Sequence, residues 1–215
     1  MTQAAEDRRS RRETVRAALS RALLELVEET PFKDISVDEI AAAAGIKRSA
    51  FYFYFRDKQE LLVAAASETA EALYAEADRW WHGQGPPERR LEEALRGMAT
   101  LYERHAGLLR AATEVSTYDD EVRVFWRDVI ERFIEATATH LEREQEAARV
   151  PRTLDARATA ESLVWMAERC CYVYLARRDR TAGELVESLS ATWAAALYAG
   201  SGGPRRATGR GAASP

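Results

Sequence analysis

Apolar residues recur at helical spacing along most of the chain, beginning with a stripe between Arg12 and Glu29. Such a stripe predicts an amphipathic helix that ends before Pro31. The sequence has no sustained apolar/polar alternation and no Asn-Gly or Asp-Gly pair, which are the usual signs of strands and hairpins. An all-α fold is therefore predicted. The stripe consists of Val15, Ala18, Leu19, Ala22, Leu23, Leu26 and Val27.

Capping patterns locate the next helices. Ser36 is followed three residues later by Glu39, a capping box that begins a helix at Val37 and lets it run to near Gly45. A short helical segment follows over 47–53. Asp57 with Glu60 then opens a long helix that reaches toward Trp81.

Beyond the Gly/Pro-rich linker 83–87, the pattern predicts further helices and about nine in all. We expect breaks at Gly107 and around Pro151. Residues 1–56 then form a small N-terminal domain, the headpiece, with residues 1–11 flexible, and 57–199 form a larger domain, the body. Residues 200–215 have no apolar face to bury and are expected to be a disordered tail. The long helices expected in the body after the linker cover 88–105, 119–149, 154–177 and 181–199.

The spacing of segments 36–44 and 47–53 around Ala44-Gly45-Ile46 is that of a helix-turn-helix. This motif needs a tight glycine turn, apolar residues that brace two helices, and polar or basic residues on the outer face. The outer face is predicted to carry Lys47, Arg48, Ser49 and Tyr52. The bracing core is predicted to contain Ile35, Val37, Ile40, Ala41, Ile46, Phe51 and Phe55.

The run FKDISVDEIAAAAGIKRSAFYFYFRDKQELL resembles the N-terminal signature of the TetR family of repressors, over about residues 12–62. The FYFYF segment, in place of the commoner Leu-Tyr-x-His-Phe, and the later MAER segment resemble the EthR-like branch. The resemblance implies a three-helix DNA-binding headpiece on a helical body that binds ligand and dimerises through its last two helices. It also implies a repressor that a small apolar or aromatic effector releases from a pseudo-palindromic double-stranded DNA operator.

Site residues follow from the resemblance position by position. Lys47, Arg48 and Ser49 would meet base edges or nearby phosphates, Tyr52 and Lys58 would bind phosphate, and Ser36 would bind phosphate at its helix start. Arginine and lysine suit guanine edges, and hydroxyls and helix starts suit phosphates. The alternative is that Lys47 and Arg48 are merely solvated and Tyr52 merely packs.

The body contains all five tryptophans. Tryptophans at helical spacing are more often core than pocket, but EthR-like proteins enclose an elongated apolar pocket, so a filled core and an open cavity both remain possible. Where relatives offer amides near the MxER segment, this chain has Val164 and Ala167, which leaves Glu168 and Arg169 as ligand contacts or as an internal ion pair. The predicted ligand-binding residues are Leu95, Met98, Tyr102, Trp126, Val129, Ile130, Phe133, Trp165, Tyr172 and Trp193.

Composition narrows the partners. A formal net charge of −4 argues against a protein that coats nucleic acid without sequence preference. A dense basic run near the N-terminus either reaches phosphates or simply solvates the helix end. No apolar stretch approaches a membrane span, and we expect a cytoplasmic protein with no membrane partner. The basic run consists of Arg8, Arg9, Arg11, Arg12 and Arg16.

An enzyme is the first competing class. His82, His105 and His140 lack metal-ligand spacing, Cys170 and Cys171 are adjacent, and no nucleophile elbow or phosphate loop occurs. We therefore predict no catalytic activity, no metal and no cofactor. The second competitor is a helical binding or scaffold protein without DNA binding, which the intact helix-turn-helix pattern disfavours.

Overall fold

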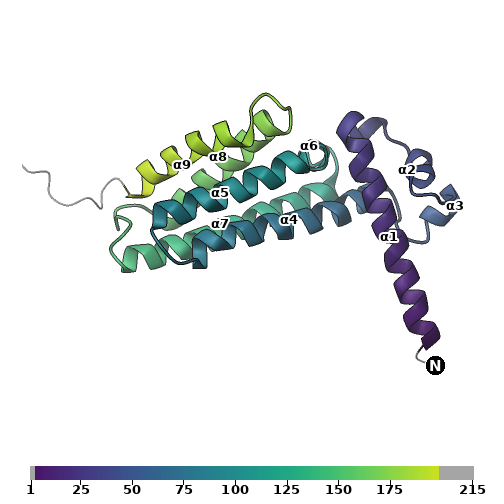
Figure 1. Ribbon diagram of the computed structural model, residues 1–215, viewed down its shortest axis with the longest axis horizontal. Helices are drawn as coiled ribbons and strands as arrows, with labels where there is room; N and C mark the ends of the chain where they lie inside the picture. The colour runs from purple at the N-terminus through teal and green to yellow at the C-terminus, as the bar shows by residue number, and fades with distance from the viewer. Residues whose placement is uncertain (1–2, 199–215) are drawn as a thin grey trace, which may run out of the picture.

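A computed structural model describes residues 3–198 of the chain, and within that range it contains helices and no strand (Figure 1). The predicted all-α class is confirmed. The α-helices are α1 Gln3–Glu29, α2 Val37–Ala43, α3 Arg48–Phe51, α4 Lys58–His82, α5 Pro87–Arg104, α6 Ala106–Val115, α7 Asp120–Glu146, α8 Ala156–Cys170 and α9 Ala182–Tyr198. The short 3-10 helix η1 spans Phe32–Asp34, and the π-helical segment η2 spans Cys171–Leu175.

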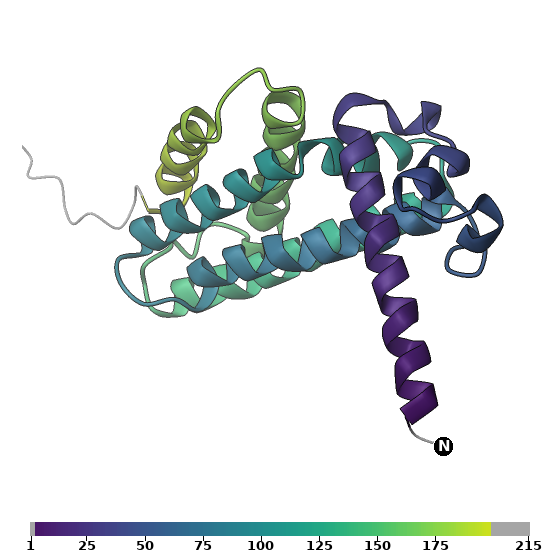
Figure 2. The ribbon, with the colours of Figure 1, turned by 45° about the vertical axis from the view of Figure 1, so that its right-hand side comes forward.

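The headpiece consists of α1, η1, α2 and α3, grouped at one end of the molecule (Figure 2). Its core buries Ile35, Ile40, Phe51 and Phe55, with Val37 and Ile46 partly buried against them, as the sequence predicts. Arg16 of α1 also joins this helix to the segment that follows α3. Its guanidinium donates to the Tyr54 carbonyl at 2.7 Å and lies 4.0 Å from the centre of the Phe55 ring.

The body packs α4 and α7 side by side (Figure 1). The helix α5 packs between α4 and α9, and α8 packs against α7. The helix α4 belongs to both domains. Its first turns bury Leu61 and Leu62 in the headpiece core, and its last turns bury Trp80 and Trp81 in the body core. Any displacement of α4 in the body would therefore also move the residues of α4 that lie in the headpiece core.

Several boundaries differ from the sequence prediction. The first helix extends back to Gln3 rather than starting at Arg12, and its N-terminal turns project clear of the other helices in both ribbon views. The helix expected over 154–177 is α-helical only to Cys170, after which the Ala176 N–H donates to the Cys171 carbonyl, five residues back. The expected final helix ends within the description at Tyr198, and the expected tail 200–215 lies outside the described residues.

The expected break at Gly107 is wrong, because Gly107 lies inside α6. A Cβ atom at this position would be 2.5 Å from the Val27 carbonyl oxygen, far closer than van der Waals contact. The glycine therefore permits close packing of α6 on α1 rather than ending a helix. The chain breaks instead at His105, which separates α5 from α6.

Within residues 3–198, no helix is both long enough and apolar enough to cross a membrane.

Candidate nucleic-acid interface and internal cavity

The start of α2 is held by the predicted capping box. The Ser36 Oγ accepts from the Glu39 N–H at 3.2 Å, and a Glu39 carboxylate oxygen accepts from the Ser36 N–H at 2.7 Å. The Ser36 hydroxyl also donates to the same carboxylate oxygen at 2.6 Å. These bonds lower the pKa of Glu39. They fix the N-terminus of α2, although they also occupy the hydroxyl that the sequence assigns to phosphate.

The turn between α2 and α3 depends on Gly45, whose φ of +70° is in the left-handed region that glycine adopts without strain. Ile46 then donates its N–H to the Ala41 carbonyl at 2.9 Å and closes the turn. This geometry brings Lys47, Arg48 and Ser49 to the surface together, all exposed. The α3 helix is short, so the next residues continue the same exposed surface as a turn.

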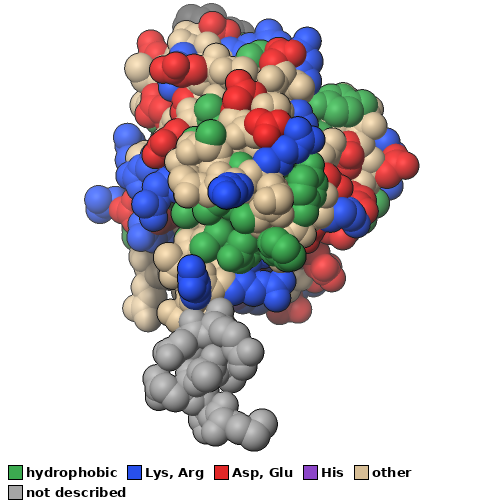
Figure 3. All heavy atoms as spheres, turned by 90° about the vertical axis from the view of Figure 1, so that its right-hand side faces the viewer, with side chains coloured by type: hydrophobic (Ala, Val, Ile, Leu, Met, Phe, Trp, Pro, Cys, Tyr) green, Lys and Arg blue, Asp and Glu red, His purple; other side chains and the backbone are tan. Residues whose placement is uncertain are grey.

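Two aromatic side chains extend this surface. Tyr52 is 49% exposed and Phe53 is 79% exposed, whereas Phe51, the last residue of α3, is buried. Figure 3 shows apolar side chains interspersed with Lys and Arg at the headpiece end of the molecule. Basic groups mixed with exposed aromatic rings are suited to the phosphates and base edges of DNA. We call the residues Lys47, Arg48, Ser49, Tyr52 and Phe53 the recognition surface.

Arg48 is not free within this surface. Its Nη1 lies 2.6 Å from a carboxylate oxygen of Asp38 on α2, in an ion pair whose two side chains are both more than half exposed. Tyr52 and Asp38 together raise the pKa of Arg48. A base contact by Arg48 must therefore compete with Asp38, a partner that the sequence analysis did not identify.

Lys58 is placed differently from the sequence prediction. Its ammonium donates to the carbonyls of Phe32, Lys33 and Ile35 at 2.9, 3.1 and 2.7 Å, and it lies 4.8 Å from the centre of the Phe32 ring. Burial lowers its pKa, while Asp34 and Glu39 oppose that shift. An ammonium has three donors, and all three are used inside the headpiece. These bonds join α4 to the η1 region, and a phosphate contact by Lys58 would compete with them.

The body contains a cavity walled by α4, α5, α7, α8, η2 and α9, which favours the open alternative over a filled core. About 90 Å³ of it is open to the centre of a water molecule, and its surface is almost wholly apolar. The predicted residues that line it are Leu95, Met98, Tyr102, Trp126, Val129, Ile130, Phe133 and Trp193. The lining residues that the prediction lacked are Leu73, Ala77, Trp80, Trp81, Leu91, Ala94, Thr137, Val164, Ala167, Glu168 and Cys171.

Trp165 and Tyr172 do not line the cavity, unlike the other eight predicted residues. The cavity face of α8 carries Val164, Ala167 and Glu168, and Trp165 points about 100° away from Val164 because of the helical repeat. Trp165 is 39% exposed and, with Tyr172, borders a separate surface hollow beside α6.

Glu168 is the charged residue of the cavity wall. Its side chain is only 5% exposed, and its carboxylate lies 3.7 Å from the Nε of Arg169, whose side chain is 56% exposed. In the expected internal ion pair, the Glu168 carboxylate is therefore buried and the Arg169 guanidinium is exposed to solvent. Burial raises the pKa of Glu168, and Arg169, Thr113 and Trp126 oppose the shift only in part.

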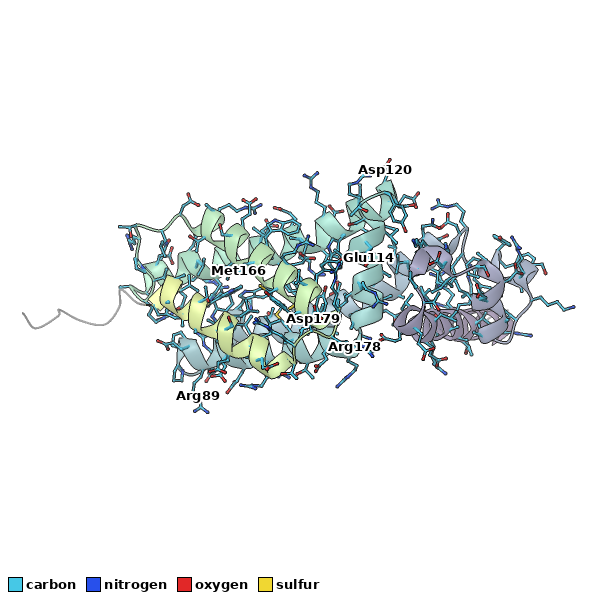
Figure 4. All side chains as sticks on the ribbon, turned by 90° about the horizontal axis from the view of Figure 1, so that it is seen from above. Arg89, Glu114, Asp120, Met166, Arg178 and Asp179 are labelled. Carbon is cyan, nitrogen blue, oxygen red and sulfur yellow. The ribbon has the colours of Figure 1, made fainter. Side chains whose placement is uncertain are left out.

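The helix α6 joins the cavity end of the body to the headpiece. Its Arg110 donates to the Val27 carbonyl of α1 at 2.7 Å and to the Ala176 carbonyl, just after η2, at 3.5 Å. Glu28 of α1 accepts from the Gly107 N–H at 3.1 Å and from Arg178 at 2.8 Å. Figure 4 shows Glu114 and Arg178 where the two domains meet.

Comparison with known proteins agrees with this arrangement. Residues 19–65 match the profile described as bacterial regulatory proteins of the tetR family, and residues 91–199 match the C-terminal domain of the transcriptional regulator EthR. The HTH-type transcriptional regulator EthR of Mycolicibacterium smegmatis is 30% identical over 187 residues, which cover 85% of each chain. The chain belongs to the EthR-like branch of the TetR family. EthR of Mycobacterium tuberculosis is 28% identical over 179 residues, 80% of this chain and 82% of that protein.

Solved TetR-family structures share the fold. The regulatory protein TetR from Rhodobacter sphaeroides superimposes with a TM-score of 0.68 at 24% identity, covering 84% of this chain and 97% of the other. The regulator PfmR from Thermus thermophilus gives 0.67 at 19% identity, covering 83% and 96%. TetR-family regulators bind DNA and form dimers and are not enzymes, so this chain is a DNA-binding transcriptional regulator.

Proposed function

We propose that this TetR-family regulator is a dimeric repressor that a small apolar molecule, bound in the body cavity, releases from its operator. The observation that carries the proposal is the shared use of α4. Leu73, Ala77, Trp80 and Trp81 of α4 line the cavity, and Leu61 of the same helix lies in the headpiece core.

DNA recognition is proposed for the recognition surface. Lys47, Arg48 and Ser49 face base edges or adjoining phosphates, and Tyr52 and the N-terminus of α2 at Ser36 face phosphates. One copy of α3 reaches too few base pairs for tight specific binding. Two copies related by a two-fold axis meet successive major grooves, about 34–36 Å apart, of a pseudo-palindromic operator.

The dimer is proposed to form through the outer faces of α8 and α9. Exposed small residues, including Ala158 and Ser162 of α8 and Ala191 and Ala195 of α9, allow close packing of helices. Leu185 and Leu189 are buried in the body core of their own chain and are therefore not available to the partner.

Release follows from the narrowness of the cavity. A molecule wider than the existing space must push apart the helices that wall it, including α4. The displacement is passed to the headpiece at Leu61 and Leu62 and, through α6, at Val27. The two recognition surfaces then leave the spacing of successive grooves, and DNA affinity falls because the effector binds the released state better.

The test is a fluorescence-anisotropy titration of the whole protein on a labelled duplex from upstream of its own gene, with and without 1-decanol as a slender apolar probe. We expect salt-dependent DNA binding that weakens by about tenfold, or 1.4 kcal/mol, with the probe. Ala167→Leu, which fills the cavity, should abolish the response, whereas Ala72→Leu on the exposed side of α4 should retain it. Probe binding that leaves DNA affinity unchanged would refute the proposed release.

A further inference from the structure

The cavity has one acidic group in an otherwise apolar wall. Glu168 of α8 lies between Val164, Ala167 and Cys171, which all line the cavity, and the whole residue is only 8% exposed. Carboxylates are rarely buried to this extent unless they are paired and hydrogen-bonded. A hydrogen-bonding or charged partner for the Glu168 carboxylate is therefore expected.

Within the described residues the carboxylate has only weak partners. Neither carboxylate oxygen of Glu168 has a hydrogen bond with good geometry, although Thr113 and Trp126 lie close by. The nearest cation is Arg169, with 3.7 Å between its Nε and the carboxylate, and that guanidinium is turned to solvent, where it lies 5.1 Å from the centre of the Tyr172 ring. A buried acceptor without a donor is destabilising, and more so when it is charged.

Two further buried oxygens lie near Glu168. The Tyr102 hydroxyl, on the cavity wall, and the Thr113 Oγ1 both lack a hydrogen bond of good geometry within the described part of the chain. The groups interact electrostatically: burial, Cys171 and Glu168 raise the pKa of Tyr102, and Thr113 opposes that shift. This end of the cavity is therefore a cluster of oxygen atoms, and the remaining walls are hydrocarbon or aromatic.

We propose that the effector is a cationic amphiphile, a slender apolar body with an amine head that binds Glu168. This proposal rests on the proposed function and assigns the chemistry of its ligand. An ammonium brings three donors and a positive charge to two carboxylate oxygens and two hydroxyl oxygens. An alcohol brings a single donor, and a carboxylic acid would bring a second negative charge.

The position of the bound amine also explains how the effector would act on the headpiece. Thr113, beside Glu168, lies on α6 one turn beyond Arg110, which holds the Val27 carbonyl. An amine drawn to Glu168 is thus placed against the helix that joins the cavity to α1. A ligand with the same body and no head occupies the hydrocarbon walls only.

The test is isothermal titration calorimetry of the full-length protein with decylamine, 1-decanol and decanoate, each below its micelle concentration. These probes share one alkyl chain and differ in the head. We expect decylamine to bind about tenfold or more tightly than 1-decanol, and decanoate to bind weakest. Glu168→Gln should remove the preference for the amine, while Glu142→Gln, an exposed carboxylate on α7, should keep it.

Equal affinities for the amine and the alcohol, or an amine preference that survives Glu168→Gln, would overturn the proposal. If 1-decanol alone releases DNA as well as decylamine does, the cationic head is wrong and the proposed function stands. If decylamine binds through Glu168 and DNA affinity does not change, the proposed release fails and the head assignment stands. A thermal unfolding curve for each variant verifies that the folded state is being compared.

Discussion

The guanidinium of Arg110 on α6 donates to the Val27 carbonyl of α1 across 2.7 Å, which joins the body to the headpiece through one side chain. The same guanidinium contacts the Ala176 carbonyl beside η2. The body thus meets the headpiece at α4 through apolar residues, at α6 through this hydrogen bond and the close approach at Gly107, and after η2 through the ion pair of Arg178 with Glu28.

Removal of the Arg110 guanidinium should reduce the effect of the ligand on DNA affinity more than it reduces ligand binding itself. We expect Arg110→Met to bind decylamine with nearly wild-type affinity but to show a several-fold smaller loss of DNA affinity when the ligand is present. Anisotropy titrations with and without ligand measure this ratio. Arg127→Met, at an exposed position on α7, is the matched control. An unchanged ratio in Arg110→Met would show that α6 does not take part in the coupling.

The Asp38 carboxylate restrains Arg48 and also faces the surface proposed to meet DNA. We expect Asp38→Asn to bind every duplex several-fold more tightly, because it frees Arg48 and removes a negative charge near phosphates. Discrimination between the operator and an unrelated duplex should fall. Competition anisotropy on the two duplexes measures both effects, with Glu68→Gln on α4 as a control for net charge. Weaker binding by Asp38→Asn would mean that the ion pair positions Arg48 for DNA instead.

Lys58 should contribute to stability rather than to DNA contact. Replacing it by methionine leaves three carbonyls of the η1 region without their donor, and we expect a loss of about 2 kcal/mol in the free energy of unfolding. Chemical denaturation measures that loss. DNA binding by the folded variant, compared with Tyr52→Phe over about 50–200 mM salt, should keep the wild-type salt slope. A salt slope reduced by about one unit in Lys58→Met would show that Lys58 does contact a phosphate.

The headpiece was predictable from sequence because its signals are local. The Ser36 capping box, the Gly45 turn and the spacing of Ile40, Phe51 and Phe55 each involve a few adjacent residues and a single period. Eight predicted cavity residues also lie together, since the apolar stripes of α5 and α7 face inward.

The structure differs from the sequence prediction where the deciding contact is distant in sequence. A local pattern at Gly107 suggests a break because the approach of Val27, 80 positions earlier, is not visible in it. The carbonyls that Lys58 contacts lie 23 to 26 residues away. The residue type of Trp165 suggests a cavity position, although its neighbours Val164 and Glu168 define the inward face.

The buried carboxylate should give the protein a particular pH dependence. Burial raises the pKa of Glu168 above its ordinary value of 4.5, so the unfolded chain ionises more readily than the folded one, and wild-type stability falls as pH rises through the raised pKa. Glu168→Gln does not ionise. We expect its melting temperature to exceed that of the wild type at about pH 7 and the difference to shrink toward about pH 4. A difference that grows on acidification would contradict the sign of the shift.

The central claim is that cavity occupancy and DNA binding are linked, and linkage is reciprocal. The most direct measurement is calorimetric titration of decylamine into the free dimer and into the dimer saturated with its operator duplex, with a duplex-only titration subtracted. The account predicts affinity about tenfold weaker for the DNA-bound protein. Equal affinity in the two states would contradict it.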